Sequence, residues 1–169
     1  INCFDTAQSY GKGQAQQTLG KILRRYPTKV FTVDTKLMPS SKPVLDLIKP
    51  SLKDFELIGI NCLYLHWPQK GFDNVDFVKQ ICTLKAKGVI ARTGVCNMEI
   101  SDLIKLKKAG LQIDRLQRPI SLLWARDLKL FQNYCKENNI ELAAYSPTGM
   151  GLLSGKYKNP DNLNDARKN

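Results

Sequence analysis

The chain has 169 residues, of which 43% are hydrophobic and 24% charged, and its formal net charge at pH 7 is +11. This length and balance predict a single globular domain over residues 1–169 with a sizeable core, ending in a polar tail or loop over residues 156–169. The longest apolar runs, such as residues 62–65, fall far short of the roughly 18–20 residues of a membrane span, so we expect no membrane-spanning segment.

Segments with the periodicity of strands alternate with segments with the periodicity of helices along the chain. Apolar and β-branched runs predict strands at residues 2–4, 29–35, 62–65, 89–95, 116–120 and 141–145, the fifth weakened by Pro119. Apolar stripes at helical spacing predict helices at residues 14–25, 41–52, 73–87, 101–109 and 127–138. We expect Ser101 to cap its helix and Gly110 to end it, whereas Pro50 either kinks the second helix or starts a new turn.

Strict alternation of strands and helices implies a parallel sheet, and both a doubly wound sheet and a (β/α)8 TIM barrel fit this order. No GxGxxG stretch follows the first strand, which argues against a Rossmann nucleotide site. Distinctive residues instead stand at the carboxyl ends of the predicted strands at near-regular intervals: Asp5, Lys36, His66, Gly94, Gln117 and Ser146. Such ends converge on one face of a barrel but lie in a row in an open sheet, so this spacing favours the barrel.

The excess of positive charge has three interpretations: attraction of an anionic cofactor, a nucleic-acid surface, or a solvated basic face. The lysines and arginines are dispersed over the polar sides of the predicted helices and do not interleave with aromatic residues. This pattern disfavours nucleic-acid binding and leaves the other two interpretations open.

The cysteine count is odd, and no pair has CxxC spacing: Cys3, Cys62, Cys82, Cys96 and Cys135. These features predict reduced thiols in a reducing compartment, and not a disulfide framework or a zinc site. No signal-peptide pattern is present, so we expect a cytoplasmic protein, with an organellar targeting segment upstream of Ile1 as the alternative.

Four side chains at the first three strand ends suit proton transfer to an oxygen. A neighbouring ammonium stabilises a phenolate, so Lys36 would make Tyr10 a better proton donor, and Asp5 would hold that ammonium in place. His66 could then orient a carbonyl or share its proton. Each residue alone has an ordinary structural explanation, such as a turn cap, a half-buried aromatic, a solvated lysine or a core histidine. Only their coincidence at strand ends favours chemistry.

The motifs around these residues resemble the aldo-keto reductase family. "FDTAQSYG" is similar to its Asp and catalytic Tyr block, "TVDTKL" to its catalytic-lysine strand, "LYLHWP" to its histidine strand and "TGVCNM" to its Gly-Val-Ser-Asn block. "AYSPTGMGLLSGKY" is similar to the family's cofactor loop. The motifs occur in family order and at family spacing over most of the chain.

The resemblance implies an NADPH-dependent reductase of aldehydes or ketones, with small carbonyl compounds as substrates. It assigns Tyr10 as the general acid, Lys36 as its activating partner, Asp5 as the support of Lys36 and His66 as the group that orients the carbonyl. Trp67 would line the substrate mouth. The residues implied to bind NADP(H) are Cys96, Asn97, Gln117, Tyr145, Ser146, Pro147, Thr148, Gly149, Met150, Gly151 and Leu152, with Asn97 at the carboxamide, Tyr145 stacked on the nicotinamide ring and the residues from Ser146 onward at the pyrophosphate.

The chain departs from the family pattern at several positions. Cys96 replaces a usual Ser, Met150 replaces a frequently polar residue, and Arg118 replaces a more typical apolar residue after Gln117. Asp34 lies two residues before Lys36 and so should share its strand face, which would add a carboxylate near the site. The six predicted strands resemble the second to seventh of the family, so we expect a partial barrel. A truncated or non-catalytic relative, such as a cofactor-binding or channel-subunit-like protein, is the alternative function.

Overall fold

A computed structural model describes residues 1–157 of the chain, so most of the predicted tail at residues 156–169 lies outside the described residues. Its single sheet has six parallel strands, and each strand pairs with the next one in the chain. The strands are β1 (Cys3–Asp5), β2 (Thr32–Leu37), β3 (Ile60–Leu65), β4 (Ile90–Cys96), β5 (Arg115–Pro119) and β6 (Glu141–Tyr145).

Helices connect the strands, and the alternation predicted from the sequence is confirmed. The α-helices are α1 (Gln14–Leu23), α2 (Val44–Asp54), α3 (Asn74–Ala86), α4 (Ile100–Lys108) and α5 (Leu128–Glu137). Two short 3-10 turns, η1 (Tyr10–Gly13) and η2 (Leu152–Ser154), follow β1 and β6. Within the described residues, no helix is both long enough and apolar enough to cross a membrane.

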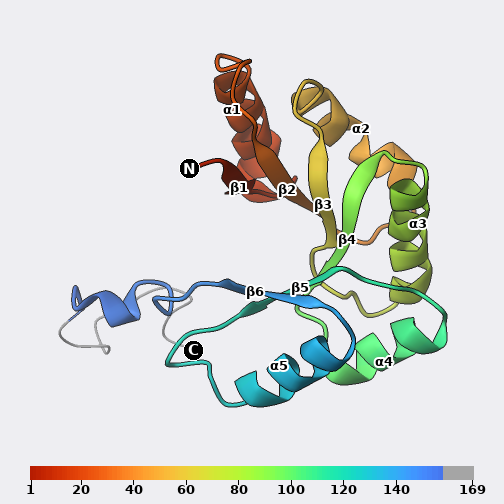
Figure 1. The fold of residues 1–169 in the computed structure, drawn as a ribbon, viewed down its shortest axis with the longest axis vertical. Helices are drawn as coiled ribbons and strands as arrows, with labels where there is room; N and C mark the ends of the chain where they lie inside the picture. The colour runs from red at the N-terminus through yellow and green to blue at the C-terminus, as the bar shows by residue number, and fades with distance from the viewer. Residues whose placement is uncertain (158–169) are drawn as a thin grey trace.

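The sheet is a part of a (β/α)8 barrel. Its strand order follows the chain without reversal, whereas a doubly wound sheet reverses its order at a switch point. Figure 1 shows the sheet curling from β1 to β6, with α1 to α5 following one another along its outer side. The barrel prediction is therefore confirmed, and the doubly wound alternative is excluded.

Alternate strand residues separate an apolar outer side of the sheet from a polar inner side. Outward side chains such as Val33, Leu63 and Val95 join the helices in one buried core. The inner side instead carries Lys36 and a small separate cluster of Cys62, Tyr64 and Cys96. Hydrophobic burial against the helices thus holds the sheet, and the polar residues are left on the concave side of the curl.

Two local expectations are corrected by the structure. Ser101 does not cap its helix, because α4 begins one residue earlier at Ile100, with Glu99 in the cap position. Ile100 packs against the core, and this apolar contact draws the residue into the first turn. The second strand begins at Thr32 and not at residue 29, and it extends through Lys36 to Leu37. Pro50 lies inside α2, which continues through it to Asp54.

Candidate active site

The carboxyl ends of β1, β2 and β3 bring the four predicted catalytic residues into contact. Lys36 lies at the centre and is almost fully buried, at 1% exposure. Its ammonium Nζ donates to Asp5 Oδ2 at 2.5 Å and to the backbone carbonyl of Thr6 at 2.8 Å. The third donor direction is toward the hydroxyl of Tyr10, at 3.5 Å. All three donor positions of this buried ammonium therefore have an oxygen partner, as a buried charge requires.

Tyr10 is positioned by the turn that follows β1. The amide of Thr6 donates to the carbonyl of Asp34 and the amide of Gln8 to the carbonyl of Lys36, so the segment continues along β2 beyond the end of the first strand. The Gln8 side chain then bonds the carbonyl of Leu47 and the hydroxyl of Ser51, both on α2. This anchoring places the Tyr10 ring with its centroid 5.1 Å from Lys36 Nζ.

A left-handed stretch ends the Tyr10 turn. Gly11, Lys12 and Gly13 have φ values of 56°, 54° and 92°, and α1 begins at the next residue. Two of these positions are glycine, the residue that adopts positive φ at no steric cost. The YGKG sequence thus explains why the chain turns directly after Tyr10 and leaves its ring half-exposed at the mouth of the curl.

His66 lies just after β3 and faces Tyr10. The two rings meet edge to face, with centroids 5.7 Å apart and an interplanar angle of 73°. The hydroxyl of Ser9 lies 3.3 Å from His66 Nδ1. Ser9 had no role in the sequence analysis, although it stands within the same "FDTAQSYG" motif. Its contact fixes the orientation of the imidazole and leaves Nε2 for another partner.

His66 is expected to stay neutral at neutral pH. Burial lowers the pKa of His66 below its ordinary 6.5, the Lys36 ammonium lowers it further, and Asp5 opposes the shift. Since this is the only histidine in the chain, its Hε1 ring proton gives one NMR signal, and we expect the titration midpoint of that signal to lie below 6.5. Because the pKa of His66 is lower in the folded state than in the unfolded state, protonation of His66 favours unfolding. The folded state therefore loses stability as the pH falls below about 6.5. A midpoint at or above 6.5 would contradict the burial and charge seen here.

Four of the predicted cofactor residues lie next to the four predicted catalytic residues: Cys96, Asn97, Gln117 and Tyr145. Asn97 adopts a left-handed conformation with φ of 58°. Its side-chain amide donates to the carbonyl of His66 at 3.1 Å and accepts from the Tyr145 hydroxyl at 2.7 Å. One N–H and one lone pair of the Asn97 amide stay available, which is the pair that a carboxamide ligand needs.

Gln117 contacts the carboxylate of Asp5, and Cys96 contacts Gln117. The Gln117 amide donates to Asp5 Oδ1 at 3.0 Å, and its carbonyl oxygen lies 3.5 Å from Cys96 Sγ. Burial raises the pKa of the Cys96 thiol, so this sulfur stays protonated. Both oxygens of Asp5 are therefore occupied, one by Lys36 and the other by Gln117. In this arrangement the Gln117 amide helps to hold the Asp5 carboxylate in place.

The predicted phosphate loop after β6 is a tight turn with several positive φ angles. Ser146, Gly149, Met150 and Gly151 have φ values of 51°, 59°, 54° and 89°. The amide of Gly149 donates to the carbonyl of Ser146, and the amide of Gly151 to Thr148 Oγ1. These two amides therefore shape the loop itself. At Gly149, an added Cβ would lie 2.7 Å from the Leu123 side chain, so this loop is closely packed against the segment after β5.

A cavity of about 630 Å³ opens beside this loop and Trp67, the residue that follows His66. Trp67, Trp124, Phe131, Tyr145 and Met150 are among its lining residues. The Trp67 ring lies 6.4 Å from the His66 ring between centroids, so the predicted substrate-mouth residue borders both the cavity and the site. This volume and this apolar lining suit a small organic ligand.

Asp34 lies on the same strand face as Lys36, as expected from the sequence. Its carboxylate is held by residues outside the four predicted catalytic ones. Asp34 Oδ2 accepts from Arg115 at 2.5 Å, and Oδ1 accepts from Asn61 at 2.6 Å. Arg115 was not among the predicted site residues, because it lies one residue before the strand predicted at 116–120, whereas the structure places it as the first residue of β5.

The described residues contain no group of three or more His, Cys, Asp or Glu side chains arranged to hold a metal ion. All five cysteines are free thiols. Burial raises the pKa of the Cys62 thiol to about 12, so a deprotonated thiolate is disfavoured there.

Comparison with known proteins agrees with this geometry. The strand order, the curl and the outer helices place the chain among (β/α)8-barrel proteins, with a polar site at the carboxyl end of the strands. The sequence model of the Aldo/keto reductase family matches residues 1–169, so the chain belongs to that family.

Curated relatives and solved structures match the chain over most of its length. It is 28% identical to the chloroplastic pyridoxal reductase of Arabidopsis thaliana, over 93% of this chain and 49% of that protein. The glycerol dehydrogenase of Gluconobacter oxydans superposes with a TM-score of 0.86 at 25% identity, over 100% of this chain and 57% of that one. An aldo-keto reductase of Klebsiella pneumoniae, solved in complex with NADPH, has a TM-score of 0.79 at 21% identity over 94% and 56% of the two chains. The chain thus spans about half the length of these relatives.

Proposed function

We propose that this protein, in its complete form, reduces an aldehyde or ketone to an alcohol with a nicotinamide cofactor, NADPH. The observation that carries the proposal is the contact of Asp5, Lys36, Tyr10 and His66 at one barrel face. A buried ammonium touching a half-exposed tyrosine hydroxyl suits proton donation to a substrate oxygen at the mouth. The pyridoxal reductase relative and the NADPH complex of another relative support this choice of substrate class and cofactor.

In the proposed mechanism the chain's own residues donate the proton and orient the substrate carbonyl. The Tyr10 hydroxyl donates its proton to the carbonyl oxygen as negative charge develops there, and the Lys36 ammonium stabilises the phenolate that remains. Neutral His66 donates a hydrogen bond from Nε2 to the same oxygen, because Nδ1 faces Ser9. Asp5, itself held by Gln117, keeps the lysine in place. The bound nicotinamide supplies the hydride.

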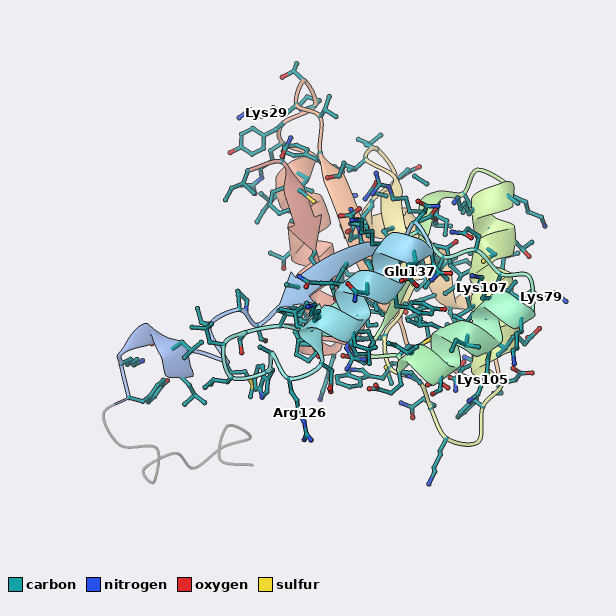
Figure 2. The ribbon with its side chains drawn as sticks, turned by 60° about the horizontal axis from the view of Figure 1, so that its bottom comes forward. Lys29, Lys79, Lys105, Lys107, Arg126 and Glu137 are labelled. Carbon is teal, nitrogen blue, oxygen red and sulfur yellow. The ribbon has the colours of Figure 1, made fainter. Side chains whose placement is uncertain are left out.

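The residues present fit such a cofactor. Asn97 keeps one donor and one acceptor for a carboxamide, and the Tyr145 ring is held beside it by its hydroxyl. Ser146, with the loop from Pro147 to Leu152, would face the phosphates, and Met150 lies there with a half-exposed apolar side chain. Exposed positive charge elsewhere on the chain, including Lys105 and Lys107 on α4 and Arg126 just before α5 (Figure 2), would add a long-range attraction for the anionic cofactor.

The direct test is to follow NADPH oxidation with a panel of aliphatic and aromatic aldehydes and ketones, together with fluorescence titration of NADPH binding. We expect binding in the micromolar range and turnover with at least one carbonyl class. Binding without turnover over the whole panel would contradict the reductase and favour a non-catalytic cofactor-binding relative. Absence of binding would contradict both.

The phosphate loop gives a separate prediction for cofactor affinity. Gly149→Ala places a side chain at φ of 59° and against Leu123, which costs about 1–2 kcal/mol in the left-handed region. We expect NADPH to bind about tenfold more weakly, with little change in kcat at saturation. Gly71→Ala is the matched control, because Gly71 also has positive φ, at 85°, but an added Cβ there would contact nothing. Equal NADPH affinity in the two variants would show that the loop does not contact the cofactor.

A further inference from the structure

A second layer of charged side chains lies on the inner face of the sheet, directly below the catalytic set. Four residues of this layer contact one another in a row, and their charges alternate in sign along the row: Asp34 on β2, Arg115 on β5, Glu141 on β6 and Arg92 on β4. Arg115 Nη1 donates to Asp34 at 2.5 Å, and its Nη2 donates to Glu141 at 2.8 Å. Arg92 donates to the same Glu141 oxygen at 2.8 Å. The proposed reaction uses none of these four residues.

This layer is one strand step from the catalytic lysine. Asp34 is two residues before Lys36 on the same strand and faces the same side, and its strand partner is Cys62, as Tyr64 is the partner of Lys36. The Tyr64 hydroxyl lies 3.4 Å from both Asp34 and Arg115. An unpaired carboxylate on the same strand face, two residues before Lys36, would attract the Lys36 ammonium.

Asp34 does not compete, because its oxygens are taken. Oδ2 holds the guanidinium, and Oδ1 accepts from Asn61. The side chain of Arg115 is only 13% exposed, that of Asp34 only 6%, and Arg115 Nε is buried without a hydrogen-bond partner among the described residues. Burying a guanidinium with an unsatisfied N–H costs free energy, so this pair is poor evidence for a stabilising role. A role in the site accounts for its presence better.

We propose that Arg115 is a positioning residue for the catalytic lysine: it neutralises Asp34 and so leaves the Lys36 ammonium to Asp5 and Tyr10. The inference rests on the proposed function for its catalytic meaning. Loss of the guanidinium frees a buried carboxylate one step below Lys36. The ammonium is then drawn down toward Asp34 and away from the Tyr10 hydroxyl, which lies at the edge of its reach at 3.5 Å.

His66 reports this displacement without any turnover. The Lys36 ammonium is one of the causes that lower the pKa of His66, and burial is the larger one. The other titratable or charged groups that the structure describes around this face are Asp5 on β1, Tyr10 on η1, Asp34 on β2, Cys62 and Tyr64 on β3, Arg92 and Cys96 on β4, Arg115 on β5, and Glu141 and Tyr145 on β6. In Arg115→Gln, a lysine that moves away and an uncompensated Asp34 both raise the His66 titration midpoint. In Asp34→Asn/Arg115→Gln, both charges are gone and the midpoint returns to the wild-type value.

The experiment compares wild type, Arg115→Gln, Asp34→Asn/Arg115→Gln and the control Arg92→Gln in the full-length protein. Arg92→Gln removes a charge from the same layer without touching Asp34. We expect Arg115→Gln to raise the His66 NMR midpoint and to lower kcat by about 10²-fold at unchanged NADPH affinity, as for a misplaced catalytic group. The double variant and Arg92→Gln should keep the wild-type midpoint and rate.

Each outcome is decisive. An unshifted midpoint in folded Arg115→Gln overturns the proposal. If Arg115→Gln does not fold, the double variant decides: a shifted midpoint there means that Arg115 acts on the site directly and not through Asp34, which also overturns it. Wild-type protein without turnover, but with the expected NMR shifts, overturns the proposed function and leaves the positioning role of Arg115 intact.

Discussion

Replacing Tyr10 with phenylalanine is expected to abolish carbonyl reduction and leave the fold and the cofactor affinity unchanged. The hydroxyl is the group that touches both Lys36 and the open mouth of the site, and no other described hydroxyl contacts that ammonium. General acid catalysis contributes about 10²–10⁴-fold to a rate, so kcat should fall by at least that range. Stability should change little, because the ring is half-exposed and its hydroxyl makes only one long contact.

The measurement is NADPH oxidation at saturating carbonyl substrate, with NADPH affinity from fluorescence titration. Tyr26→Phe is the matched control, because Tyr26 is a similarly exposed tyrosine that lies far from the site and contacts Lys29. Wild-type kcat in Tyr10→Phe would rule out Tyr10 as the acid. A parallel loss of NADPH binding would instead indicate that the ring holds the cofactor and that the activity result says nothing about proton donation.

The largest effect on stability is expected for Gly20→Ala. Gly20 lies where α1 crosses α2, and an added Cβ would stand 2.2 Å from the backbone carbonyl oxygen of Asp54. A backbone atom cannot rotate aside as a side chain can, so the two helices must separate. Overpacking of this kind costs about 1–3 kcal/mol and sometimes more, and here it also disturbs the Arg24 bond to the same oxygen.

Urea unfolding of the protein measures this cost, with Gln17→Ala on the exposed side of α1 as the control. Ala is the better helix former in both substitutions, so propensity alone would make both neutral or stabilising. An unfolding midpoint for Gly20→Ala at or above that of Gln17→Ala would contradict the close helix crossing. Because Gln8 bonds α2 and α1 follows Tyr10, loss of this crossing should also lower activity.

Most of the fold could be predicted from the sequence, because hydrophobic periodicity reflects burial directly. Among the described residues, the alternation of periods identified the six strands and the five α-helices, and β6 at Glu141–Tyr145 matched the prediction at both ends. The two 3-10 turns were not predicted. Errors were confined to element ends. Ser101 looked like a cap by residue type, yet the core contact of Ile100 extended α4 past it. The preference of a residue type for the N-cap position stabilises a helix by about 1 kcal/mol, and the burial of an apolar side chain can contribute more.

The sequence predicted which residues gather at the candidate site, but not all of the contacts between them. The structure brings Asp5, Tyr10, Lys36 and His66 together, with Trp67, Asn97, Gln117 and Tyr145 around them. The contacts of Ser9 with His66 and of the Thr6 carbonyl with Lys36 were found only in the structure, because a hydroxyl or a backbone carbonyl has no distinctive signal in a sequence. The assignment of Gln117 to the cofactor stays a prediction, since its amide is seen to bond Asp5 and Cys96.

By itself the sequence determined the class of fold, the face on which the special residues gather and the family to which the chain belongs. These depend on local periodicity and on motifs, and both are properties of neighbouring residues. Only the tertiary structure decided which carboxylate holds which cation. Asp34 is close to Lys36 in the chain and Arg115 is distant, yet the curl of the sheet carries Arg115 across to Asp34. Charge pairing depends on distances in space, and the register of six strands sets those distances.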